Sequence, residues 1–349
     1  MSTDLPIDLR LSEEQRISRE GMRRFASQTL APGARAADEA ATADPQVLAA
    51  IAGFGLTLMS LPEALGGAGL PRSPMGNVLA CEDLGEGDLS QSLAALAPLG
   101  VVNALLDFGD DAQHEAWLPR FASEEPVPAA VALAEPRATF EPGDLRTTAR
   151  RDGDDYVLDG EKCLIPLVAQ CQLFLVVAAA DDGPAAFVVE ADSAGLSRAR
   201  QDYMGLRSAE PGTLTLEGVR VPAAQRLAHF DLERLVSLSR IGLAALATGC
   251  CQAVLEQCVP YALERKAFGE AIARRQSVAF MIADIGIEIE GMRLLTWRAA
   301  SRAEQGLPFQ REAYLAFLQS MEKAMRIATD GVQVFGGAGF VRDYPLEMY

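Results

Sequence analysis

The chain has 349 residues, 49% of them hydrophobic, which is enough apolar material for two or three domains around a large core. Its formal net charge of −17 argues against a general positive field for nucleic acid or an anionic membrane. Any anionic ligand must therefore be held by local groups. The N-terminal segment MSTDLPIDLR lacks the basic and apolar regions of a signal peptide, so we expect a cytoplasmic protein.

The side chains that build common metal sites are scarce. The six cysteines show no CxxC spacing, and only two histidines, His114 and His229, are present. A structural or catalytic metal site needs more ligands in a tighter pattern than this. We therefore expect no metal site and expect reduced thiols.

The first third of the chain predicts helices. Ser12 stands three residues before Gln15, a capping-box spacing, and apolar residues follow at helical intervals. Short polar connections separate the later segments, which suggests one compact bundle. These helical segments cover residues 45–54, 74–86, 89–107 and 110–122.

Near Pro126 the pattern changes to short β-branched or alternating runs bounded by Gly, Pro and Asp. A small all-β module of about a hundred residues is expected here. Its predicted strands include residues 156–160, 172–180, 185–191 and 213–222.

From about residue 231 the sequence again predicts helices, over residues 231–264, 275–304 and 310–335. The uncharged run 241–255 is shorter than the roughly 20 residues that span a membrane, so it predicts a buried core helix and no membrane insertion. The expected fold class is a mainly α, multidomain α+β protein: an N-terminal helical domain (1–125), a small β-barrel or sandwich domain (126–226) and a C-terminal helical bundle (227–349).

Glu233 begins the helix that carries this uncharged run, in the stretch HFDLERLVSLSR. An acid in a first turn complements the helix dipole and can simply face water, with Asp231 as the N-cap. Alternatively, Glu233 is a base in a dry site, because apolar or small residues follow it and the next acid on the helix is Glu256.

Five segments, in order, resemble the acyl-CoA dehydrogenase family: LPEALGGAGL, DGDDYVLDGEK, LEGVRVP, YALERKAFGEAIARRQSVAFMIADI and ATDGVQVFGGAGFVRDYPLEMY. The resemblance implies a helical domain, a β domain and a four-helix domain. It also implies that the protein binds FAD at a dimer interface and oxidises the α–β bond of an acyl-CoA.

The resemblance assigns two groups of residues to the flavin cofactor. Residues matching R-x-x-F-G…Q and Q-x-x-G-G contact the nucleotide of a neighbouring subunit: Arg265, Phe268, Gln276, Gln333, Gly336 and Gly337. Residues of two segments of the β domain, LAEPRATFEPGDL and KCLIP, contact the cofactor of their own subunit: Leu133, Ala134, Ile165 and Pro166. An arginine fork and close backbone approach at glycines both suit a pyrophosphate.

The β-domain segments depart from the family pattern. LAEPRATFEPGDL has Ala134 for a threonine and RATF for a glycine and serine run, and KCLIP has Leu164 and Pro166 for a tryptophan and a threonine. Side-chain donors to the cofactor are therefore lost, although backbone N–H groups could still serve. Arg137 is a candidate to take over contact with the phosphates.

The resemblance also bears on the base. Some family members place it on the helix after the β domain in an E-R-L context, which Glu233 matches, with Arg234 beside it assigned to substrate binding. Other members use a glutamate in an E-G-T segment further on, which this sequence does not contain. Glu233 is then expected to lie in a dry pocket.

The resulting expectation is an FAD-dependent acyl-CoA dehydrogenase that passes electrons to an electron-transfer flavoprotein. Oligomeric assembly, as a homodimer or homotetramer or with a homologue, is implied because Arg265 and Gln333 would act across an interface. Two alternatives remain open: a flavin-poor, catalytically silent subunit of a heteromer, and an oxygen-using relative.

Overall fold

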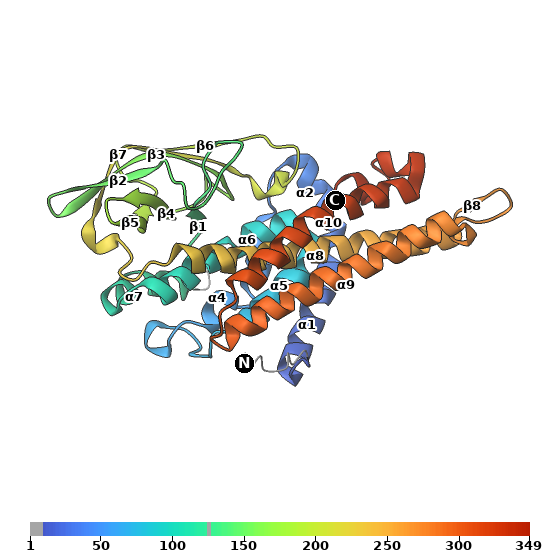
Figure 1. Cartoon of the computed structure of the whole chain (residues 1–349), viewed down its shortest axis with the longest axis horizontal. Helices are drawn as coiled ribbons and strands as arrows, with labels where there is room; N and C mark the ends of the chain where they lie inside the picture. The colour runs from blue at the N-terminus through green and yellow to red at the C-terminus, as the bar shows by residue number, and fades with distance from the viewer. Residues whose placement is uncertain (1–9, 124–126) are drawn as a thin grey trace. The chain divides into compact units, whose positions relative to one another are not determined.

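The computed structural model describes residues 10–123 and 127–349. The predicted domain boundary at 125/126 and most of the N-terminal segment MSTDLPIDLR lie outside the described residues. Ten α-helices and nine strands are present in the described part of the chain (Figure 1). The helices are α1 Glu13–Phe25, α2 Ala31–Ala40, α3 Pro45–Ala52, α4 Leu56–Met59, α5 Pro74–Gly87, α6 Leu89–Phe108, α7 Asp111–Trp117, α8 Leu232–Glu264, α9 Gln276–Glu304 and α10 Gln310–Phe335.

Local sequence signals account for several helix ends. The capping box at α1 is confirmed: the Gln15 N–H donates to Ser12 Oγ at 3.1 Å, and the Ser12 N–H donates to Gln15 Oε1 at 2.9 Å. The segment predicted as one helix over 110–122 is α7 followed by a 3₁₀ turn, because Pro119 cannot continue the α-helical hydrogen bonds.

The β module forms one curled seven-stranded sheet, with order β1-β4-β2-β3-β7-β6 and β5 paired to β4. Its strands are β1 Ala129–Ala132, β2 Thr148–Asp152, β3 Asp155–Ile165, β4 Leu173–Ala180, β5 Gly183–Glu190, β6 Leu196–Arg200 and β7 Gly212–Pro222. Sequence patterns predicted β3, β4, β5 and β7. They missed β1, β2 and β6, which are only four or five residues long, too short for an alternating pattern to be recognised in the sequence.

The chain divides into two compact units that do not follow its order. One contains residues 10–36, 73–89 and 237–349; the other contains residues 37–72 and 90–236, apart from the undescribed 124–126. The first thus combines α1 and α5 with α9, α10 and most of α8, and has its own apolar core around Val254, Ile289 and Phe335. The second combines the sheet with α3, α4, α6 and α7, around cores that include Phe174 and Leu105.

A short hairpin, β8 Lys266–Ala267 with β9 Glu270–Ala271, follows the C-terminal end of α8 and precedes α9 (Figure 1). Two helices, α6 and α8, are long and apolar enough by composition to cross a membrane, but 44% and 56% of their most apolar stretches are buried inside the protein. Core helices share this length and composition, so both helices are weak evidence for a membrane span.

Candidate functional site

The sheet unit brings the two altered β-domain segments together. Residues after β1, including Leu133 and Ala134, lie beside the end of β3: the Cys163 N–H donates to the Ala134 carbonyl at 2.9 Å, and Lys162 Nζ donates to the Leu133 carbonyl at 3.1 Å. Four predicted cofactor residues, Leu133, Ala134, Ile165 and Pro166, therefore belong to two adjoining segments. The Ile165 side chain is fully buried in the sheet core, so only its backbone can face a ligand.

A buried ion pair holds this junction. Lys162 is fully buried and donates to Glu135 Oε1 at 2.9 Å, and Glu135 also accepts the N–H groups of Arg146 and Thr147. Burial opposes the charge on Glu135, but the N–H donors of Thr147 and Arg146 and the Lys162 ammonium together lower its pKa to about 2. Both charges are satisfied, so they act as a structural clamp between β1 and β3. Sequence reasoning missed Lys162, although it is the first residue of KCLIP, a segment already assigned to the cofactor.

The backbone at KCLIP is irregular. The pairing of β3 with β7 shifts register between Lys162 and Ile165, and Leu164 adopts a left-handed conformation with φ +57°. The Leu164 side chain is 56% exposed. A large apolar side chain is thus presented to solvent at the position where the family resemblance expects an aromatic contact with the flavin.

Glu233 lies in the first turn of α8. The Arg234 N–H donates to Asp231 Oδ1 at 3.0 Å, which confirms Asp231 as the N-cap. Glu233 itself is exposed, whereas the next residues, Leu235 and Val236, are buried. The expectation of a dry pocket around Glu233 is therefore wrong for this structure: the helix turns its apolar face inward and leaves Glu233 on the solvent side.

Arg234, predicted to bind substrate, is engaged within the sheet unit. Its Nε lies 3.3 Å from Asp107 Oδ2, and Arg72 pairs with the same carboxylate. Asp107 is largely buried between the two guanidinium groups. A contact from Arg234 to substrate must therefore coexist with this ion pair.

In the helical unit, a cavity of about 600 Å³ brings together Arg265, Gly336 and Gly337, which lie about seventy residues apart in the chain. The other predicted residues of this group, Phe268, Gln276 and Gln333, are exposed but do not line the cavity. Phe268 is 95% exposed in the β8–β9 hairpin. The further lining residues are Tyr261, Glu264, Ile272, Val334, Phe335, Ala338 and Tyr344.

The glycine turn at this cavity has a conformation that requires glycine. Gly336 has φ +60° and ψ −132°, which a side chain would make strained, and a Cβ on Gly337 would point into open space. Three aromatic rings support the turn: Tyr261 stacks on Phe335 with centroids 3.8 Å apart, and Tyr344 packs edge-on against both. Sequence reasoning did not identify these rings.

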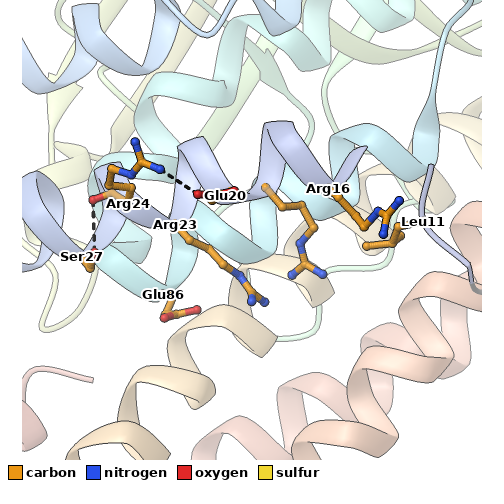
Figure 2. A pocket seen from close by; sticks show the side chains of 8 residues that line it. Leu11, Arg16, Glu20, Arg23, Arg24, Ser27 and Glu86 are labelled. Carbon is orange, nitrogen blue, oxygen red and sulfur yellow. Dashed lines mark hydrogen bonds and ion pairs between the residues drawn. The ribbon is translucent and has the colours of Figure 1, made fainter. Parts of the chain in front are cut away.

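A second hollow in the helical unit, of about 540 Å³, follows α1 (Figure 2). Its arginines are paired: Arg24 with Glu20, Arg16 with Glu13, and Arg19 with the buried Asp83. Glu86 lies at its edge. The hollow therefore has little free positive charge for an anionic ligand.

Comparison with known sequences identifies one family along the whole chain. Models of the acyl-CoA dehydrogenase N-terminal, middle and C-terminal domains match residues 12–125, 130–219 and 232–349. The probable acyl-CoA dehydrogenase YngJ of Bacillus subtilis (strain 168) is 33% identical, over 98% of this chain and 92% of its own length.

Solved structures agree with the sequence match. Butyryl-CoA dehydrogenase from Megasphaera elsdenii aligns with a TM-score of 0.90 and 28% identity, over 98% of this chain and 93% of that chain. A glutaryl-CoA dehydrogenase from Mycobacterium smegmatis in complex with FADH2 aligns with a TM-score of 0.88 and 25% identity, over 97% and 88% of the two chains. This chain belongs to the acyl-CoA dehydrogenase family.

Proposed function

We propose that the protein catalyses α,β-dehydrogenation of an acyl-CoA thioester with FAD as its cofactor, Glu233 as the base and an electron-transfer flavoprotein as the electron acceptor. The observation that carries the proposal is the full-length family match, in domain order, of a chain whose two β-domain segments adjoin as a cofactor site requires. The relatives named for butyryl-CoA and glutaryl-CoA suggest a short acyl group.

The residues present fit FAD. The Gly336–Gly337 turn has no side chains, and the space beside it is open, so a ligand can approach its backbone closely. Arg265 at the same cavity supplies the local positive charge that a dinucleotide phosphate needs in a chain of net charge −17. Arg265, Phe268, Gln276, Gln333, Gly336 and Gly337 would hold the nucleotide of a neighbouring subunit. Leu133, Ala134, Ile165 and Pro166 would line the flavin of their own subunit, chiefly through backbone groups.

The reaction removes two hydrogens from the substrate. FAD, when bound, accepts the hydride that leaves the β-carbon. The Glu233 carboxylate takes the α-proton, and the electron pair of that C–H bond becomes the new C=C bond. Because Glu233 is exposed in this structure, its basicity depends on how far a bound acyl chain excludes water from it.

The Glu233→Gln variant tests the base. Without a proton acceptor, reduction of the bound flavin by butyryl-CoA in an anaerobic rapid-mixing experiment should slow by about 10²–10⁴-fold. The FAD content should stay unchanged, because the proposed role of Glu233 is proton abstraction from the substrate and not cofactor binding. Glu115→Gln, an exposed acid on α7, is the matched control and should react like wild type. A Glu233→Gln protein as fast as wild type would show that another group is the base and that Glu233 is only a first-turn acid.

We also propose that the protein is cytoplasmic and assembles as a homotetramer. The six cysteines are free thiols, as expected in a reducing compartment, and cell fractionation would test this placement. Exposed apolar residues recur every seven positions along α9, at Phe280 (61% exposed), Ile287 (68%) and Leu294 (48%). Such a stripe on one helical face suits a helix–helix interface between subunits.

A second candidate is a catalytically silent subunit that pairs with an active homologue. Two residues of KCLIP favour this candidate, because both replace residues that the family pattern gives to the flavin: Leu164, which is exposed, and Pro166, which has no N–H to donate. A purified protein that stays colourless after addition of FAD would support this candidate over the first.

A further inference from the structure

Arg137 stands in the loop between β1 and β2, at a position where the family pattern has glycine. Its side chain is only 12% exposed, and Nη1 donates to Asp144 Oδ2 at 2.6 Å. Nη2 donates to the Asp144 carbonyl, and the guanidinium lies over the Phe140 ring at 5.4 Å. The loop thus folds around a nearly buried cation.

This cation is incompletely satisfied. Within the described residues, Nε of Arg137 is buried and has no hydrogen-bond partner. Glu135 approaches only to 3.9 Å, and its oxygens are already occupied by Lys162, Arg146 and Thr147. A buried donor of a charged group that lacks a partner is costly, so an additional acceptor oxygen would be favourable here.

The counter-ion of Arg137 is easily exchanged. Asp144 is 75% exposed, so water competes for its carboxylate and the ion pair is weak. An anionic ligand that reached the loop could take over Nη1 and also bind the unpartnered Nε. The loop adjoins the segment Leu133–Ala134, which the family resemblance assigns to the flavin, through the Glu135–Lys162 clamp.

We propose that Arg137 binds the FAD pyrophosphate, exchanging the Asp144 carboxylate for phosphate oxygens and thereby replacing hydroxyl donors that the family pattern has in this loop. A planar guanidinium binds two oxygens of a phosphate at once, which a single hydroxyl cannot do. The Phe140 ring would keep the guanidinium plane in place. This inference rests on the proposed function, because it needs FAD to be the cofactor.

Titration of the apoprotein with FAD, followed by flavin fluorescence, tests the exchange. Arg137→Ala should weaken FAD binding by about tenfold or more, the strength of a charge-assisted contact. Asp144→Asn should strengthen FAD binding by about two- to fivefold, because it removes a competitor as strong as an exposed ion pair. Arg150→Ala and Asp154→Asn, exposed residues on β2 and at the β2–β3 turn, are the matched controls and should leave the affinity unchanged.

The sign of the Asp144→Asn effect separates binding from a structural role. If Arg137 only locks the loop, losing Asp144 should weaken FAD binding as losing Arg137 does. Weaker or unchanged binding by Asp144→Asn, or unchanged binding by Arg137→Ala, overturns the inference. Asp144 is exposed, so its variant should fold even if Arg137→Ala does not. A wild-type protein that binds no FAD overturns the proposed function and this inference together, whereas normal FAD binding with unresponsive variants overturns this inference alone.

Discussion

Glu86 on α5 is the acid whose ionisation should control stability near neutral pH. Burial, and then the nearby Glu256 on α8, raise its pKa to about 7, while Arg23 on α1 acts in the opposite direction. Asp83 and Glu82 on the same helix add further negative charge. Figure 2 shows Glu86 and Arg23 on the walls of the hollow along α1.

The sign of the pH effect follows from proton binding. Between the unfolded pKa near 4.5 and the folded pKa near 7, the folded state holds the Glu86 proton more tightly, so the free energy of unfolding falls as pH rises. Glu86→Gln removes this loss. At pH 8 it should be more stable than wild type by on the order of 1–3 kcal/mol, and at pH 4 the difference should vanish.

Urea unfolding at both pH values measures this difference. Glu20→Gln, an exposed acid at the same hollow, is the control and should show little pH-dependent change relative to wild type. Equal stability of Glu86→Gln and wild type at pH 8 would mean that Glu86 is not held at a raised pKa.

At the scale of single residues, sequence reasoning depended on motifs and could not assess exposure. It located Arg265 and the Gly336–Gly337 turn, which the structure brings to one cavity. Apolar neighbours in the sequence suggested that water would be excluded from Glu233. In the helix, however, these neighbours lie on the buried face and Glu233 lies on the exposed face. The buried Lys162–Glu135 pair was missed because burial of a lysine depends on contacts between segments 27 residues apart.

At the scale of elements, glycines set how closely α5 and α8 pack. A Cβ on Gly249 of α8 would lie 2.0 Å from the Glu82 carbonyl oxygen and 2.8 Å from the Glu86 nitrogen, both on the α5 backbone. On the same helix, Gly242 has no heavy atom of the described residues within 4 Å of its Cβ position. The two positions therefore form a matched pair.

Gly249→Ala should force the two helices apart and lower the free energy of unfolding by about 1–3 kcal/mol, as overpacking does. Gly242→Ala should instead raise it by up to about 1 kcal/mol, because alanine favours helix. Denaturant unfolding of both variants checks the contrast. A Gly249→Ala protein as stable as Gly242→Ala would contradict the close packing of these helices.

The elements that sequence predicted well are the long helices. Helices α8, α9 and α10 are 33, 29 and 26 residues long, and their predicted limits agree with the structure to within one residue. Strands β1, β2 and β6 are stabilised by neighbours in the sheet rather than by their own pattern, so no local signal marked them.

In the whole molecule, the division into two compact units could not be predicted from sequence, because α1 and α5 belong to the same unit as α9, α10 and most of α8, which begin at residue 232 or later. Each unit holds one part of the residues that we propose to bind FAD. Arg265 and Phe268 are exposed in the helical unit, which suits contact with a neighbouring subunit rather than with residues of their own unit.

The proposed cofactor site requires residues from two subunits. Light scattering should report an oligomer, and Ile287→Glu, which places a charge in the exposed apolar stripe of α9, should shift the protein towards smaller species. Asp284→Asn, an exposed acid on the same helix, is the control and should not shift it. A wild-type monomer that still binds FAD tightly would contradict cofactor binding across subunits.

The most direct test of the proposed function is whether an acyl-CoA reduces the flavin of the purified wild-type protein. The protein, saturated with FAD and kept free of oxygen, is titrated with butyryl-CoA while the flavin absorbance is recorded. We predict loss of the oxidised flavin band together with formation of the α,β-unsaturated thioester. An unchanged flavin spectrum with butyryl-CoA and with longer and branched acyl-CoA thioesters, in a protein that binds FAD, would contradict the assignment as an acyl-CoA dehydrogenase.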